Sequence, residues 1–364
     1  MTEFDVVKQN EGRCLCLVQK SIRKFDLNLS RLEVLTEAAS GYYVLTPLMA
    51  ALAGAERVYA LTRDSRYGNG EAVSQLTMTL AKGWGIEDRI DILVSREDAR
   101  IGLADIITNL GFVRPMDAYF LGRLKRNVVI PLMFETWEYR EADLDLFECR
   151  RLGIPVLGTN EHHPDLRTFE YIGLIAIKLL FEIGIEIFRS NIIVMGSGEF
   201  AEQVILSLRA ANATVTFLST EKEINFVSKS AWQALKEAEA VVVVEHQSHN
   251  MLIGKAGLIK AEDLYALNPL LIVIHICGGV DQDALEAVHL RHHPTKFAPP
   301  GKMSVTTDCL GPKPLVDLHT AGLKVGEELA RARARGLLRQ EAESLVLQKT
   351  SLAQGFHNNS LEKG

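Results

Sequence analysis

The most constraining feature of this sequence is a glycine-rich turn, GSGEFA at residues 196–201, directly after the apolar run 191–195. A helical pattern begins at the turn, and a second apolar run follows at 214–218. In such a unit the first glycine permits a tight turn, Gly198 lets a backbone approach a pyrophosphate, and small Ala201 allows close helix–strand packing. The helix N-terminus also attracts phosphate. Strand, turn, helix and strand at this spacing predict a Rossmann-type dinucleotide-binding domain; the alternative is a tight turn that binds nothing.

Apolar runs of strand length alternate with helix-period segments through most of the chain. Their Val, Ile and Leu content suits strands that are buried on both faces. The expected strands are 14–18, 57–61, 90–94, 104–108, 128–130, 154–157, 191–195, 214–218, 240–244, 271–275 and 315–317. This alternation predicts an α/β fold with two parallel-sheet domains, of which the second is the Rossmann domain.

A loop at 158–164, GTNEHHP, precedes a long helical pattern at 166–188 and marks a hinge between domains. We expect an N-terminal α/β domain over 1–160, which carries the substrate and catalytic groups and is completed by a C-terminal helix from 320–340. The NAD(P)-binding domain spans 161–319, and a polar tail covers 348–364.

Composition excludes several classes of function. A net charge of -6 and a pI near 6.0 give no basic footprint for nucleic acid or an anionic membrane. The five cysteines contain no C-x-x-C pair and are expected to be reduced thiols of a cytoplasmic protein, and no metal-ligand spacing is present. The most apolar helix contains Lys178, Glu182 and Glu186, which a membrane span tolerates poorly. We expect a small-molecule substrate and leave a homodimer open.

Four further segments fall in order around the glycine turn. They are DLDLFECRRLGIPV at 143–156, AVVVVEH at 240–246, IHICGGVDQDAL at 274–285 and LHTAG at 318–322. Together with the turn, they resemble the D-2-hydroxyacid dehydrogenases, the family of formate and glycerate dehydrogenase-like Rossmann proteins, over roughly half of the chain. The resemblance implies an NAD(P)-dependent oxidoreductase that acts on a small polar carbonyl or hydroxy compound.

The resemblance also implies roles for individual residues. LHTAG matches the segment that carries the family's catalytic histidine, so His319 is the expected acid–base group, and Asp308 is the nearest candidate to orient its ring. Arg140, Trp137 and His162 are the expected substrate contacts, because an arginine fork suits a carboxylate. The alternatives are a backbone-satisfied His319 and a solvated surface Arg140.

The expected cofactor contacts come from the turn, the end of the second strand and the family-like segments. They are Gly196, Gly198, Glu199, Phe200, Ser219, Thr220, Lys222, His246, Cys277 and Gly278. Ser219 stands where NAD-binding proteins usually place an acid for the ribose 2′-hydroxyl, which tilts the choice from NAD towards NADP.

The chain departs from the family at important positions. Cys277 replaces the substrate-binding arginine, the glutamate that holds the catalytic histidine has no clear counterpart, and the residues 134–140 replace the substrate-loop glycines. Two alternative functions follow: an enzyme similar to S-adenosylhomocysteine hydrolase, with tightly held NAD and no net redox change, or a non-catalytic dinucleotide sensor. A weaker resemblance of 46–61 and 85–94 to S-adenosylmethionine-dependent methyltransferases is interpreted as shared α/β architecture.

Overall fold

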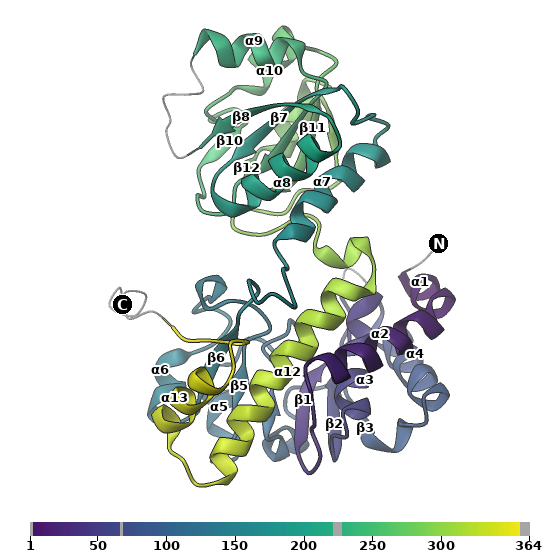
Figure 1. Ribbon diagram of the computed structural model, residues 1–364, viewed down its shortest axis with the longest axis vertical. Helices are drawn as coiled ribbons and strands as arrows, with labels where there is room; N and C mark the ends of the chain where they lie inside the picture. Colours follow the sequence, from purple (N-terminus) through teal and green to yellow (C-terminus); the bar gives the residue numbers. More distant parts are fainter. Residues whose placement is uncertain (1–2, 66–67, 221–227, 357–364) are drawn as a thin grey trace. The chain divides into compact units, whose positions relative to one another are not determined.

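The computed structural model describes residues 3–65, 68–220 and 228–356 and forms two compact units (Figure 1). Unit 1 consists of Met1–Leu166 with Gly311–Gly364, and unit 2 consists of Arg167–Leu310. The chain therefore divides at Leu166 and Leu310, whereas the sequence predicted divisions at 160 and 319. Among the described residues, no helix has both the length and the apolar character needed to cross a membrane.

Unit 1 is built on mainly parallel strands, with β1 between β2 and β4. The strands are β1 (Glu33–Glu37), β2 (Arg57–Leu61), β3 (Ile90–Leu93), β4 (Ile106–Ile107), β5 (Ile130–Pro131), β6 (Val156–Thr159) and β14 (Ala353–Gln354). They run in the orders β3-β2-β1-β4 and β14-β6-β5, with β14 antiparallel to β6. A parallel bridge between Ile106 and Val129 links the two groups.

The helices of unit 1 are α1 (Glu3–Gln9), α2 (Glu11–Lys24), α3 (Leu45–Leu52), α4 (Gly70–Gly83), α5 (Ala118–Gly122), α6 (Leu146–Leu152), α12 (Pro312–Ala334) and α13 (Arg339–Lys349). Several of them pack against these strands, among them α12, α3 and α4. The 23-residue helix α12 lies across the sheet (Figure 1). Two glycines let it approach: a Cβ at Gly322 would lie 2.6 Å from the Met133 sulfur, and one at Gly326 would lie 2.8 Å from Ile106 and Pro131 side-chain carbons.

Unit 2 contains a parallel sheet in the order β13-β11-β9-β7-β8. Its strands are β7 (Asn191–Gly196), β8 (Thr214–Ser219), β9 (Ala240–Val244), β11 (Ile272–Cys277) and β13 (Arg291–His293), and β10 (Met251–Ile253) pairs separately with β12 (Gly279–Val280). After β8 the chain crosses to the other side of β7 and forms β9. The strand order therefore reverses between β7 and β9, which is where open α/β sheets bind their ligands, beyond the carboxyl ends of the strands.

The helices of unit 2 are α7 (Glu170–Glu182), α8 (Gly198–Ala210), α9 (Lys229–Glu237), α10 (Ala261–Leu267) and α11 (Gln282–Ala287). Helix α7 packs directly on α8 because Gly173 has no side chain. A Cβ at that position would lie only 2.0 Å from the Ser207 hydroxyl oxygen. This contact fixes the helix that begins at the glycine turn.

The predicted α/β class with parallel sheets is confirmed, but two predicted strands are wrong. Residues 14–18 belong to α2, where Cys14 and Val18 form one buried helical face, and residues 315–317 belong to α12. Both are short apolar runs, which fit a buried helix face as well as a strand. Strand β1 was missed. In the predicted polar tail, residues 353–354 form β14, whereas 357–364 lie outside the described residues.

Candidate functional site

The glycine turn has the conformation that its sequence demands. A Cβ at Gly196 would lie 2.2 Å from the Val244 carbonyl oxygen, so only glycine lets β7 approach β9 here. Gly198 opens α8 with φ +59, a left-handed conformation that L side chains rarely adopt. The turn is therefore fixed by both packing and backbone conformation.

Gly198 is packed closely against the residues that follow β9. A Cβ there would lie 2.6 Å from Gln247 Nε2 and 3.0 Å from His246 Cε1, so glycine lets these two side chains lie directly against the turn. The turn lies at the N-terminus of the 13-residue helix α8, whose dipole and N–H groups favour an anion. Gln247 was not predicted from the sequence.

A buried carboxylate at the end of β9 was also missed. Glu245 is 0% exposed and accepts hydrogen bonds from the Ser197 hydroxyl at 2.8 Å and from the N–H groups of Gln247 and Ser248 at 2.7 and 2.9 Å. Its other oxygen accepts from the Thr220 hydroxyl. Glu245 thus ties together the residues that follow β7, β8 and β9. An acid directly after the run AVVVV was the available signal.

These bonds affect the predicted ribose contacts. The Thr220 hydroxyl already donates to Glu245. Ser219 is the last residue of β8 and pairs with Gly196. Lys222, predicted for the same task, lies outside the described residues.

His246 and Phe200 are brought together as a stacked pair. Their ring centroids are 4.2 Å apart at an interplanar angle of 18°. The centroid of the Phe200 ring also lies 5.3 Å from that of Phe169. Burial lowers the pKa of His246, while the carboxylates of Glu245 and Glu199 act in the opposite direction. The structure therefore places His246 and Phe200 beside the turn, with Glu199 in the first turn of α8.

Cys277 stands at the position of the family's substrate-binding arginine but cannot supply its positive charge. It is 2% exposed at the end of β11, and burial raises the pKa of its thiol, so the sulfur stays protonated. The following Gly278 has φ +124. Its carbonyl accepts a bond from Nε2 of the buried His275 at 3.0 Å, and Ser304 contacts the other ring nitrogen at 2.7 Å. His275 is thus a hydrogen-bonded core histidine.

His319 lies inside α12 rather than at the start of a helix after a strand, as the sequence predicted. The ring is 4% exposed, its Nδ1 lies 2.8 Å from the Thr46 hydroxyl, and its centroid lies 5.8 Å from that of Tyr43. Burial lowers the pKa of His319 to about 4. Its observed ring partner is a hydroxyl. Asp308 belongs to unit 2, where it accepts a bond from the Thr306 hydroxyl.

Two of the predicted substrate residues meet on one carboxylate. His162 Nδ1 and Trp137 Nε1 each lie 2.8 Å from an oxygen of Glu135, which is 2% exposed. Arg140 is exposed on the same loop. Glu135 was not predicted, and its partner His162 is 27 residues away in the sequence.

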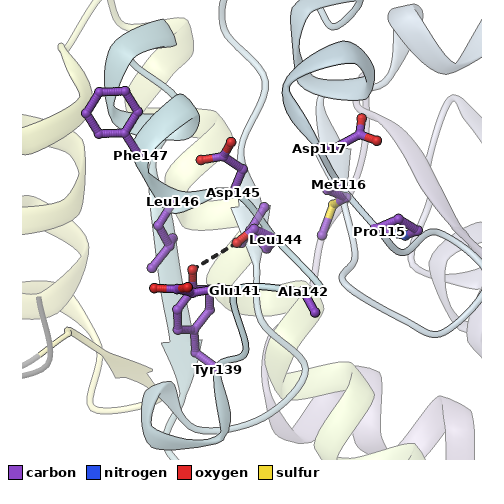
Figure 2. Close-up of a pocket in the computed structure, with 10 residues that line it drawn as sticks. All are labelled: Pro115, Met116, Asp117, Tyr139, Glu141, Ala142, Leu144, Asp145, Leu146 and Phe147. Atoms are coloured by element: carbon purple, nitrogen blue, oxygen red, sulfur yellow. Dashed lines mark hydrogen bonds between the residues drawn. The ribbon is translucent and has the colours of Figure 1, made fainter. Parts of the chain in front are cut away.

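A cavity of about 420 Å³ lies elsewhere in unit 1, near the starts of α5 and α6 (Figure 2). The Asp117 and Asp145 carboxylates in its wall accept from backbone N–H groups that open these helices. The Tyr139 hydroxyl donates to the Leu144 carbonyl at 2.9 Å, the dashed line in Figure 2. None of its lining residues belongs to the predicted site. Within the described ranges, no group of three or more His, Cys, Asp or Glu side chains is arranged to hold a metal ion.

Comparison with known proteins gives matches only among solved structures. No protein family and no curated protein matches the chain. A component of dipicolinate synthase from Bacillus halodurans is 11% identical, with a TM-score of 0.48, over 80% of this chain and 96% of that one. The pyruvate reductase of Chlamydomonas reinhardtii is 12% identical, with a TM-score of 0.48, over 83% and 97%. A putative D-isomer specific 2-hydroxyacid dehydrogenase from Polaromonas is 13% identical, with a TM-score of 0.42, over 79% and 98%.

Proposed function

We propose that the chain is an NAD(P)-dependent oxidoreductase that acts on a small polar carbonyl or hydroxy compound. The observation that carries the proposal is the β7–turn–α8–β8 unit, with Gly198 beside the Gln247 amide at the point where the strand order reverses. Phosphate binding at such a helix N-terminus is favoured by the helix dipole and its unpaired N–H groups.

Each cofactor residue has a distinct task in this proposal. Gly198 and the first turn of α8 hold the pyrophosphate, Gln247 donates its amide to it, and the Phe200–His246 stack forms an adjoining wall. Ser219 and Lys222 remain the candidates for the ribose 2′-position, because Thr220 is engaged by Glu245. A bound nicotinamide supplies or accepts a hydride at the substrate carbon.

The substrate side of the proposal rests on unit 1. Arg140 and Trp137 are proposed to contact an anionic substrate, since both are exposed on one loop and a guanidinium suits a carboxylate. His319 is the acid–base residue that the family resemblance implies. Its burial lowers its pKa and makes it a neutral ring near pH 7.

Nucleotide binding tests the proposal directly. NADH or NADPH at about a hundred times Kd should raise the free energy of unfolding by about 2.7 kcal/mol, measured as a thermal shift. Gly198→Val should abolish that shift because the side chain would push Gln247 and His246 away from the turn and strain its left-handed backbone. Gly184→Val is the matched control: it strains a left-handed glycine of unit 2 that has open space around it, at φ +86.

The same experiment separates the competing functions. Absence of a shift in the wild type with either nucleotide at millimolar concentration contradicts the proposal. Nucleotide retained through purification would favour the class with tightly held NAD. Steady turnover of a carbonyl substrate would exclude a non-catalytic sensor.

A further inference from the structure

Glu135 and His162 are held together by the pairing of two adjacent parallel strands. Glu135 follows β5 and His162 follows β6. The N–H of Thr159, the last residue of β6, donates to the Phe134 carbonyl beyond β5 at 3.0 Å, so the pairing continues past the end of β5. Because parallel strands end at the same edge of a sheet, both side chains emerge at the carboxyl edge of unit 1. This is the edge at which open α/β sheets carry their functional groups.

The hydrogen bonds define the state of the histidine ring. Oε1 of Glu135 accepts from the Glu161 N–H at 3.0 Å and contacts His162 Nδ1 at 2.8 Å, and Oε2 accepts from the Trp137 indole at 2.8 Å. A carboxylate can only accept, so Nδ1 of His162 must be the donor. The neutral ring then keeps its lone pair on Nε2.

The His162 ring is partly exposed. The His162 side chain is 50% exposed, whereas its carboxylate partner is 2% exposed. A rigidly held imidazole with one nitrogen committed to a buried carboxylate and with an exposed ring is the usual arrangement of a general acid–base group. His319, in contrast, is 4% exposed and is paired with a hydroxyl.

A second proton-holding group lies beside this pair. Burial raises the pKa of Glu138 to about 7, against the effect of its hydrogen bonds to the Glu161 side chain and the Glu135 backbone and of the Arg140 charge. Glu161 is 5% exposed and directly precedes His162. Two hydrogen-bonded carboxyl groups can share one proton.

We infer that His162, oriented by Glu135, is the acid–base group of the reaction, with His162 as the catalytic residue and Glu135 as a positioning residue. The inference rests on the proposed function for the identity of the reaction. In the reducing direction the Nε2–H bond of the protonated ring breaks, and an O–H bond forms at the substrate oxygen while the ring keeps the electron pair. A reduced nicotinamide dinucleotide, when bound, would supply the hydride to the substrate carbon. In the oxidising direction Nε2 takes the hydroxyl proton.

Turnover and nucleotide affinity are measured for the wild type, His162→Gln, Glu135→Gln and His163→Gln. The probes are NADH and NADPH, with pyruvate and glyoxylate as carbonyl substrates. His162→Gln should lower kcat by about 10²–10⁴-fold with nearly unchanged nucleotide affinity. His163→Gln is the matched control, since its ring accepts a bond from the Asp165 N–H at 3.2 Å. Turnover that survives His162→Gln would overturn the inference.

The ring tautomer provides a readout that needs no substrate. In ¹⁵N spectra of histidine-labelled protein, the neutral His162 ring should carry its proton on Nδ1, and His163 should carry it on Nε2. Glu135→Gln should shift His162 towards the Nε2–H form and change the pH profile of kcat. An Nε2–H tautomer of His162 in the wild type overturns the inference, whatever the nucleotide result. So does a His162 tautomer that is the same in Glu135→Gln as in the wild type. Failure of the wild type to bind either nucleotide overturns the proposed function instead.

Discussion

The buried Glu245 carboxylate accepts a hydrogen bond from the Ser197 hydroxyl at 2.8 Å, which joins the end of β9 to the turn after β7. Since Thr220 donates to the same carboxylate, one side chain holds the ends of three neighbouring strands. The carboxyl ends of β7, β8 and β9, where the glycine turn lies, are therefore held together by an acid outside the glycine motif.

Glu245→Ala should destabilise unit 2 because it leaves two hydroxyls and two backbone N–H groups without their acceptor. We expect a loss of about 2–5 kcal/mol in the free energy of unfolding. Urea unfolding followed by Trp232 fluorescence, in a Trp84→Phe/Trp137→Phe background, reports on unit 2 alone. Glu202→Ala, at an exposed acid of the same unit, should change it by less than about 0.5 kcal/mol. Equal effects would show that the Glu245 bonds add no stability.

Two glycine-to-alanine substitutions in unit 1 should have opposite effects on stability, because only one of the new methyl groups would meet packed side chains. Gly326→Ala should destabilise by about 1–3 kcal/mol, because the new Cβ would meet Ile106 and Pro131 carbons at 2.8 Å. Gly12→Ala in α2 meets nothing within 4 Å and should stabilise by up to about 1 kcal/mol through helix propensity. Thermal unfolding of both variants checks this. A stabilising Gly326→Ala would mean that α12 has room to shift.

The sequence predicted the fold best where local spacing determines it. The runs 57–61 and 191–195 form β2 and β7, and the turn at 196–201 opens α8. The runs 14–18 and 315–317 were wrongly predicted to be strands, because a few apolar residues in an amphipathic helix resemble a short buried strand. Strand β1 was hidden by its polar ends: Glu33 accepts a bond from the Tyr59 hydroxyl, and Glu37 accepts from the Phe112 N–H.

The candidate site was harder to predict, because its contacts depend on strand pairing. Glu245 follows an apolar run and could have been noticed as an unusual strand-end acid. The Glu135–His162 bond joins residues 27 positions apart that only the pairing of β5 with β6 brings together. A single sequence shows each residue but not this pairing. The family resemblance directed attention to His319, whose buried position in α12 no local pattern indicates.

The buried state of His319 predicts a pH dependence of unit 1 stability. Its pKa is lowered from 6.5 to about 4, so between these values only the unfolded chain takes up the proton. The free energy of unfolding must therefore fall as the pH drops through this window, by about 3 kcal/mol in total. His319→Gln cannot titrate and should lose less stability than the wild type between pH 7 and pH 4.5. Urea unfolding at both pH values measures the difference, and parallel losses would show that the ring is not held neutral.

Nucleotide selectivity should depend on the end of β8. Because Thr220 is engaged by Glu245, a 2′-phosphate would rely on Ser219 and Lys222. Lys222→Ala should then weaken NADPH by about tenfold, or about 1.4 kcal/mol, and NADH much less. Ser219→Asp should reverse the preference, since an acid accepts from the ribose hydroxyl but repels a phosphate. Lys229→Ala is the control, as an exposed lysine at the start of α9. Equal losses for both nucleotides in Lys222→Ala, or a native preference for NADH, would assign the chain to NAD.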